Sequence, residues 1–385
     1  MKKILGRVPP VGQPIAHKRS EHPVRLAGCS QQVLVQSGTA ALALALAAIR
    51  KARPCENPEV IIPAYCCPDL LSAIDQQGMK AVLVDFAPGS AQLDLDVLQA
   101  ALNDNTIAVI AVNFLGLPER IGALRTALQG SNAYIVEDAA QWFPNDDSLP
   151  LDRGDIIIHS FGKGKPVSLL GGGIALVPAA SSRSLALESE NIGQPRDGTD
   201  LRGIVKRAIQ TLKFHAYNLV LSPWFYWLVD VNPLVETGTT RYKQLAGIDS
   251  MSPEIASYLA NNIEQYQAVP VSSCIETQQK IEALFKGSEV FQLLDGATEH
   301  RLLRFPVLVN DPEVRAELLA LSKRLGLGIS VMYAKTLPHI EGVDSAQLGG
   351  QDHPNAKRFA QQLITLPVHP QSISAIAPLI RHFLT

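Results

Sequence analysis

The sequence predicts an α/β protein with a mostly parallel sheet, and two observations lead to this prediction. Short, nearly continuous apolar runs recur between residues 30 and 180, and helical stretches separate them. Such runs are typical of strands that are covered on both faces, and helices between them are typical of parallel crossover units. The runs are Glu59–Pro63, Ala81–Phe86, Thr106–Phe114, Ala133–Val136, Asp155–Ser160 and Gly173–Val177.

The expected elements of the first half follow in chain order. Residues 1–30 are expected to form an irregular arm. Thr39–Ile49 is rich in Ala and Leu and is apolar nearly all round, which predicts a buried helix. Leu93–Leu102 and Arg120–Leu128 are predicted helices between strands.

The second half alternates between helical and strand-like patterns, which predicts a smaller α+β domain. A chain of 385 residues is also too long for one simple core. We therefore expect an N-terminal arm over 1–30, a large domain over 31–250 with an aromatic-rich insertion at 200–245, and a small C-terminal domain over 251–385. In the small domain, helices are expected within Pro253–Lys286 and at Glu313–Leu325, Ala356–Leu363 and Ile373–Leu384, and strands at Arg301–Val309 and Gly328–Met332.

The composition excludes several classes of protein. Hydrophobic residues make up 46% and charged residues 18%, which indicates a folded protein, and the net charge of −2 argues against a nucleic-acid partner. The five cysteines are odd in number and irregularly spaced, and prolines follow Lys2 and Lys3 where a signal peptide would be apolar. We expect reduced thiols and a cytoplasmic location. The His and Cys residues do not cluster in a zinc pattern, so no metal site is expected.

The stretch Leu201–Val231 contains Trp224 and Trp227 within an apolar run. This run is shorter than the ~20 residues that a membrane-spanning helix needs. One interpretation is a buried helical pair, as at a subunit interface. The alternative is a contact with a membrane surface through Trp224 and Trp227.

A small-residue turn, Ser37-Gly38-Thr39-Ala40, stands where the predicted buried helix begins. The first N–H groups of a helix have no partners within the helix and attract anions, so this turn suits a phosphate. Gly38 would allow close approach, and Thr39 would add a hydroxyl donor. The alternative is that Ser37 or Thr39 only caps the helix.

A carboxylate follows the apolar strand at Ala133–Val136. Asp138 should emerge at the carboxyl edge of the sheet, where parallel sheets bind ligands. A carboxylate there can keep a pyridine nitrogen protonated, and Gln141 can reach the same ring. The alternative is that Asp138 caps the following turn.

Two lysines follow the last predicted parallel strand, within Ser160-Phe161-Gly162-Lys163-Gly164-Lys165-Pro166. A lysine can form an imine with an aldehyde, and Ser160 can bind the same phosphate as the turn at Gly38. The chemistry alone does not choose between Lys163 and Lys165. A phosphate turn, a ring-binding carboxylate and a lysine are the groups that pyridoxal phosphate (PLP) requires.

In order and spacing, these motifs resemble the PLP-dependent sugar aminotransferases of the DegT/StrS type. The resemblance implies that Gly38, Thr39, Ala40 and Ser160 bind the phosphate, that Asp138 and Gln141 bind the ring, and that Lys165, not Lys163, holds PLP. It implies the fold type I architecture, with a mostly parallel seven-stranded sheet and a small α+β C-terminal domain. It further implies a homodimer that moves an amino group from glutamate to a keto-sugar, usually nucleotide-linked, in polysaccharide or glycoconjugate biosynthesis.

The chain departs from this family pattern at several positions. Cys67 stands where an aromatic residue often stacks on PLP, and Asn113 stands where histidine is common. The segment 247–252 lacks the Asn and Arg of the family. Two alternatives therefore stand beside the aminotransferase: a dehydratase or lyase on the same fold, and a catalytically degenerate, non-enzymatic relative. Lys165 argues against the family's sugar dehydratases, in which a histidine replaces it.

Overall fold

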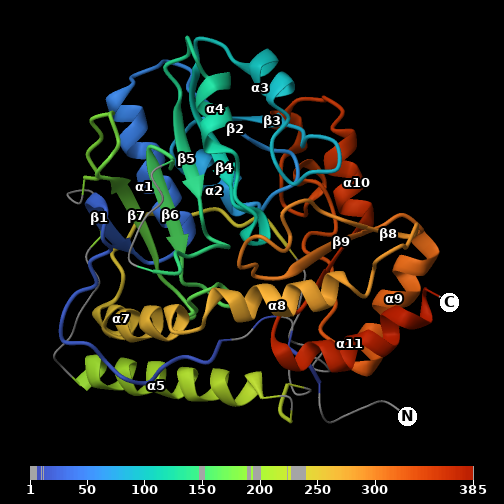
Figure 1. The fold of residues 1–385 in the computed structure, drawn as a ribbon. Coiled ribbons are helices and arrows are strands. Elements are labelled where there is room, and N and C mark those ends of the chain that lie inside the picture. Colours follow the sequence, from blue (N-terminus) through green and yellow to red (C-terminus); the bar gives the residue numbers. More distant parts are fainter. Residues whose placement is uncertain are drawn as a thin grey trace.

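The computed structural model describes residues 7–9, 11, 13–146, 152–188, 192–193, 201–222, 224–226 and 240–384. A seven-stranded sheet forms its centre, with the strand order β1-β7-β6-β5-β4-β2-β3 (Figure 1). β7 runs antiparallel to both neighbours, and the remaining strands pair in parallel. The strands are β1 (Cys29–Val35), β2 (Glu59–Pro63), β3 (Lys80–Val84), β4 (Thr106–Val112), β5 (Tyr134–Asp138), β6 (Ile156–Ser160) and β7 (Gly173–Pro178).

Helices cover both faces of this sheet, which explains why its strands read as continuous apolar runs. Ile61 and Val109 pack on the side of α3 (Leu95–Ala101) and α4 (Ile121–Ala127). Their chain neighbours Val60 and Ala108 pack on the side of α1 (Gly38–Ala52). Successive side chains of a strand point to opposite faces, so both sets must be apolar. The predicted fold class is confirmed.

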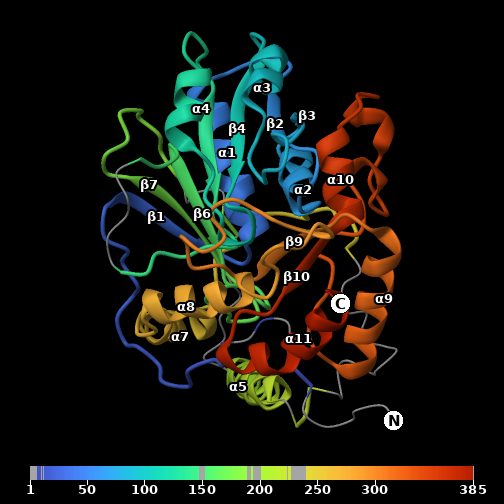
Figure 2. The ribbon, with the colours of Figure 1, turned by 45° about the vertical axis from the view of Figure 1, so that its right-hand side comes forward.

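The C-terminal part contains a three-stranded antiparallel sheet in the order β10-β9-β8. Figure 2 shows this sheet beside the large one, with α9 and α11 on its outer side. Its strands are β8 (Phe291–Leu293), β9 (Phe305–Val309) and β10 (Leu363–Leu366). The other helices are α2 (Asp69–Gln76), α5 (Leu201–Leu221), α7 (Pro253–Gln267), α8 (Val271–Glu282), α9 (Pro312–Leu325), α10 (Pro354–Gln362) and α11 (Pro370–His382), with 3-10 turns at Phe114–Gly116, Leu337–His339 and Ser345–Leu348.

The C-terminal part is joined to the carboxyl ends of the large sheet by hydrogen bonds. The Asp85 carboxylate, just after β3, accepts bonds from the N–H groups of Asn355 and Ala356 at the start of α10. The N–H of Leu303 donates to the carbonyl of Leu115, after β4. These contacts place Leu303 and the start of α10 at the sheet edge where ligand sites form. The domain boundary at residue 250 stays a prediction.

Two local expectations differ from the structure. The strand predicted at Gly328–Met332 is wrong, because this segment makes only an isolated bridge between Ser330 and Thr365. The side chain of Ser322 bonds both the N–H and the carbonyl of Ile329, so these groups take no part in a ladder. β1 replaces the end of the expected arm, and its polar Gln31 and Gln32 hide it in the sequence.

The aromatic-rich stretch is described only in part. Its described part is a single helix, α5, followed by a turn. Leu212 is 68% exposed and Trp224 62% exposed in the chain. Trp227 lies outside the described residues. Within the part of the chain that the structure describes, no helix is both long and apolar enough to cross a membrane.

Candidate active site

The predicted phosphate turn lies at the N-terminus of α1. Ser37 is extended, and its Oγ accepts a hydrogen bond from the N–H of Ala40 at 3.1 Å. The capping alternative therefore describes Ser37 correctly. Thr39 is half-buried and follows directly in the first turn of the helix. A cap of this kind orders the first helical turn, whose N–H groups attract anions.

Ser160 lies against this turn, although 122 residues separate it from Gly38. A Cβ placed on Gly38 would stand 2.6 Å from the Cβ of Ser160 and 2.8 Å from its Oγ. A Cβ on Gly173 would stand 2.4 Å from the carbonyl oxygen of Ser37. Both glycines are thus required by close approach. The turn and the serine form one small cradle at a helix N-terminus.

Asp138 ends β5, one strand away from Ser160 at the end of β6. Its side chain is buried, and its Oδ1 accepts a hydrogen bond from the N–H of Ala140 at 2.9 Å. Burial raises the pKa of this carboxyl, while the Ala140 N–H and the charge of Lys165 act in the opposite direction. Burial disfavours the charged form of this carboxyl, and a cation placed beside it would stabilise that form.

The two candidate lysines differ in position. Lys163 is exposed, whereas Lys165 is half-buried and lines a cavity of about 270 Å³. The same cavity is lined by Gln141, Arg301 and His369. The structure therefore places Lys165 on the wall of a cavity and leaves Lys163 in solvent.

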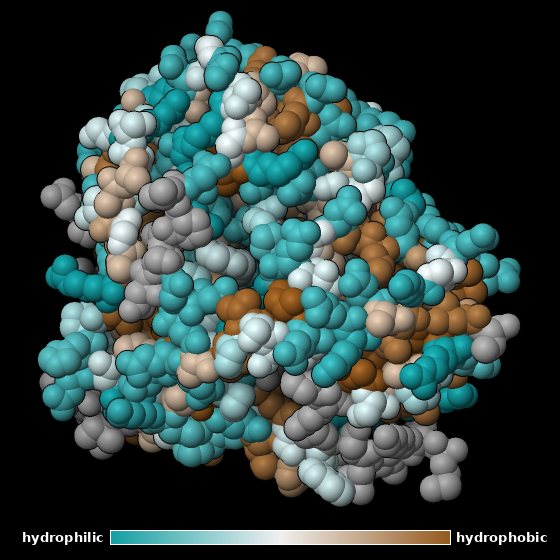
Figure 3. Space-filling model, viewed as in Figure 1, coloured by the Kyte–Doolittle hydropathy of each residue, from teal (hydrophilic) through white to brown (hydrophobic). Residues whose placement is uncertain are grey.

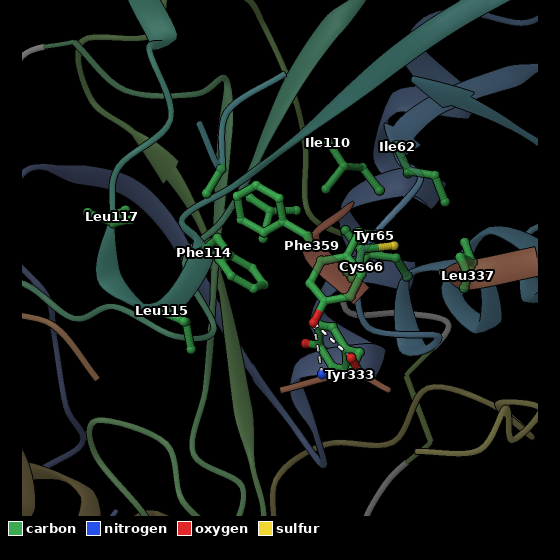
Figure 4. Close-up of a cluster of buried hydrophobic side chains, with 14 of the residues drawn as sticks. Ile62, Tyr65, Cys66, Ile110, Phe114, Leu115, Leu117, Tyr333, Leu337 and Phe359 are labelled. Carbon is green, nitrogen blue, oxygen red and sulfur yellow. Dashed lines mark hydrogen bonds between the residues drawn. The ribbon is translucent and has the colours of Figure 1, made fainter. Parts of the chain in front are cut away.

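Gln141 connects this cavity to a tyrosine that the sequence did not single out. Its Oε1 accepts from the N–H of Leu115 at 2.8 Å, and its Nε2 donates to the hydroxyl of Tyr333 at 3.2 Å. Figure 4 shows Tyr333 beside Tyr65, whose hydroxyl donates to the carbonyl of Tyr333 at 2.9 Å and accepts from its N–H at 3.1 Å. Burial raises the pKa of Tyr333 well above its ordinary value, so the hydroxyl stays neutral. No sequence motif marks Tyr333.

Cys67 and Asn113, which replace common family residues, have different surroundings. Cys67 is half-buried, and burial raises the pKa of its thiol to about 12. It is therefore a neutral, polarisable group and not a thiolate nucleophile. The Asn113 amide donates to Glu137 at 2.8 Å and accepts from the N–H of Glu119 at 3.0 Å. Its side-chain nitrogen thus binds a carboxylate that also forms a buried ion pair with Arg153.

The altered segment 247–252 packs beside the phosphate turn of the same chain. Gln36 and Asp249 exchange hydrogen bonds, with the N–H of Gln36 donating to the Asp249 carbonyl at 2.9 Å. The methyl group of Met251 would lie 2.5 Å from a Cβ on Gly172. The segment therefore holds the strand β1 and the glycine run in place.

Arg301 is a second residue that the sequence did not reveal. It is 8% exposed, its guanidinium lies 3.6 Å above the ring of Tyr266, and its Nη1 donates to the Tyr266 carbonyl at 2.9 Å. Among the described residues no carboxylate lies within ion-pair distance of it. A buried guanidinium without a counterion on the wall shared with Lys165 favours an anionic ligand.

The first half of the chain is similar in sequence to a known protein family. Residues 24–201 match the sequence model of the DegT/DnrJ/EryC1/StrS aminotransferase family. The GDP-4-keto-6-deoxy-D-mannose 3-dehydratase of Yersinia pseudotuberculosis is 32% identical over 114 residues, or 29% of each chain. The dTDP-3-amino-3,4,6-trideoxy-alpha-D-glucose transaminase of Micromonospora megalomicea subsp. nigra is 28% identical over 179 residues, or 46% of this chain and 47% of that protein. The chain thus matches less than half the length of either relative.

Solved structures match nearly the whole chain. The PLP form of Spr1654 from Streptococcus pneumoniae, named as a sugar aminotransferase, has a TM-score of 0.65 at 20% identity and covers 94% of this chain and 89% of its own. The sugar aminotransferase CalS13 from Micromonospora echinospora has a TM-score of 0.62 at 19% identity and covers 92% and 88%. Likeness at this identity shows the fold. Residues 24–201, the part of the chain that matches the sequence model of the DegT/DnrJ/EryC1/StrS aminotransferase family, contain Gly38, Asp138 and Lys165.

Proposed function

We propose that the protein is a PLP-dependent aminotransferase that moves an amino group from an amino acid, glutamate by family likeness, to a nucleotide-linked keto-sugar. The observation that carries the proposal is convergence at one sheet edge. Lys165 and Gln141 line one cavity, and the charge of Lys165 acts on the buried carboxyl of Asp138. The Gly38–Ser160 cradle lies at the ends of the same part of the sheet.

The residues fit PLP at three points. The cradle offers the N-terminus of α1, the Ser160 hydroxyl and a space without a Cβ to a phosphate. Asp138 would hold the pyridine nitrogen, and Lys165 would hold the aldehyde carbon. When bound, PLP supplies an electron sink for the carbanion that forms when the donor loses its Cα proton.

Lys165 has a second task in this proposal. Its Nζ would be the base that takes the Cα proton of the amino donor and later gives that proton up. Its half-buried position on the cavity wall reduces the contact of this amine with bulk water.

Asp138, Gln141 and Tyr333 orient the ring. A protonated ring nitrogen would offset the burial that raises the pKa of Asp138, so the cofactor and the carboxylate stabilise each other. Gln141 is fixed at both ends of its amide, by Leu115 and by Tyr333, and so presents a rigid edge to the cavity. Cys67 would give this wall a neutral thiol in place of an aromatic ring.

Arg301 supports an amino donor that carries a carboxylate. A planar guanidinium binds a carboxylate through two parallel hydrogen bonds, and Arg301 has no described carboxylate partner of its own. The cavity thus combines a cation for the donor with the amine of Lys165.

The test is a visible absorption spectrum of the purified protein with added PLP, before and after L-glutamate. Wild type and Lys163→Ala should show a cofactor band that glutamate bleaches, and Lys165→Ala should show none of this behaviour. Borohydride reduction followed by peptide mass mapping should place the cofactor on Lys165. Absence of a band in the wild type would overturn the proposal and favour a non-enzymatic relative.

The product identifies the reaction class. Incubation with glutamate and a nucleotide-linked keto-sugar should give an aminated sugar and 2-oxoglutarate by mass spectrometry. A dehydrated sugar without the amine would instead show a dehydratase. Sedimentation analysis of the same preparation tests the proposed homodimer.

A further inference from the structure

One face of α5 remains exposed in the chain and carries large apolar side chains. Val205, Ile209, Leu212 and Leu219 are 49%, 47%, 68% and 51% exposed. Their spacing of four, three and seven residues places them on one side of a helix. Trp224 and Phe225 extend the row past the helix end and are 62% and 41% exposed. We call these six residues the outer face of α5.

The opposite side of α5 holds the helix on the protein. Phe214 is fully buried and makes an edge contact with Tyr258 of α7 at 5.0 Å between ring centres. The Asn218 amide bonds both the N–H and the carbonyl of Ile15 in the N-terminal arm, at 2.7 and 2.8 Å. Figures 1 and 2 show α5 at the edge of the molecule, beyond α7. The outer face is therefore not needed to dock the helix, and it is free for another surface.

The charge of this segment is unlike that of the chain. From Leu201 to Tyr226 the sequence contains four basic residues, Arg202, Lys206, Arg207 and Lys213, and no acidic residue. The whole chain has 34 Lys and Arg against 36 Asp and Glu. A basic segment with exposed apolar and aromatic side chains complements an anionic surface that has an apolar interior.

We propose that the outer face of α5 binds the surface of an anionic lipid bilayer, with the helix lying in the plane of the headgroups. In this arrangement Leu212 and its neighbours enter the acyl boundary, and Trp224 sits at the headgroup level, where tryptophan is favoured. A second copy of the chain fits less well, because a twofold contact between two α5 helices would bring basic segments together. Figure 3 shows apolar side chains at the lower edge of the molecule, where Figure 1 places the end of α5.

The experiment is sedimentation of the purified protein with vesicles of phosphatidylcholine alone and of phosphatidylcholine mixed with phosphatidylglycerol. Wild type should bind the mixed vesicles at low salt, and high salt should weaken the binding. Ile209→Glu/Leu212→Glu should lower the vesicle-bound fraction at least tenfold. Val97→Glu on α3, where Val97 is 38% exposed, is the matched control and should bind like wild type. Brominated lipids should quench the tryptophan fluorescence of the wild type, and this quenching should be weaker in Trp224→Phe.

Failure of the wild type to bind anionic vesicles at low salt would overturn the proposal, and so would binding of the double variant at the wild-type level. If neither form binds vesicles and the double variant changes the sedimenting mass of the protein, the face is a subunit contact. Circular dichroism of each variant verifies folding, and the result does not depend on whether the protein is an aminotransferase.

Discussion

Gly38 and Ser160 stand so close that a single methyl group on Gly38 would lie 2.6 Å from the Cβ of Ser160. Gly38 starts α1 and Ser160 ends β6, so the contact joins a helix N-terminus to a strand end. The backbone around Gly38 also abuts Gly173, where a Cβ would stand 2.7 Å from the nitrogen of Gly38. The geometry of the proposed phosphate site is thus set by the absence of a side chain.

Gly38→Ala tests this contact. The added Cβ must push Ser160 or the first turn of α1 away, which should cost about 1–3 kcal/mol of unfolding free energy. We expect the affinity for PLP to fall at least tenfold in equilibrium titrations. Gly350→Ala is the control, since a Cβ there meets nothing within 4 Å. Unchanged PLP affinity in Gly38→Ala would separate the turn from the phosphate.

The local part of this site could be predicted from the sequence, and the distant part could not. The turn at Gly38, Asp138 after its strand and Lys165 in its loop each occupy a short motif whose local structure follows from neighbouring residues. Tyr333 reaches Gln141 across 192 positions of sequence, and no periodicity reports such a contact.

Some elements of the fold could likewise be predicted from the sequence and others could not. Strands covered on both faces were predicted because burial on both sides removes polar alternation, as at Ile61 and Val109. β1 was missed because it is an edge strand whose Gln31 and Gln32 face partly outward. Two interpretations of α5 stayed open because apolar composition does not say whether a helix is covered.

Asp138→Asn should separate stability from function. The amide keeps the acceptor for the Ala140 N–H but removes a buried charge, so the cofactor-free variant should gain about 1–2 kcal/mol at neutral pH in urea unfolding. The raised pKa of Asp138 means that the folded protein holds its proton more tightly than the unfolded chain. The gain is therefore largest above the folded pKa and disappears as the pH falls toward the ordinary aspartate value of about 4.

The same variant should lose function while gaining stability. Without the carboxylate the ring nitrogen is not kept protonated, and we expect the rate of the glutamate half-reaction to fall by about two orders of magnitude or more. A variant that reacts at the wild-type rate would remove Asp138 from the proposed ring contact.

The buried side chain of His159 should make the protein less stable at acidic pH. Burial lowers its pKa to about 4, and its Nδ1 faces the carbonyls of Ala139 and Trp142. The unfolded chain binds this proton near pH 6.5 and the folded protein only near 4, so stability should fall as the pH drops through that window, by about 3 kcal/mol in all. His159→Gln should flatten this fall in urea unfolding series. An equally steep fall in the variant would assign the acid sensitivity to other groups.

Arg301→Gln tests the proposed donor contact. Losing the guanidinium removes a paired hydrogen bond to a carboxylate, which should raise the apparent dissociation constant for glutamate at least tenfold in single-turnover measurements. The keto-sugar half-reaction should change much less. Arg301 also bonds the carbonyl of Tyr266, so a purely structural role must be distinguished.

The two half-reactions make that distinction. A structural defect at the end of α7 would disturb the shared cavity and weaken both substrates alike, whereas a lost carboxylate contact weakens only the donor. Arg301→Lys keeps the charge without the planar pair of donors, and it should recover part of the glutamate affinity. An amine donor without a carboxylate should react equally with wild type and Arg301→Gln. Equal losses in both half-reactions would instead identify Arg301 as a residue that only caps α7.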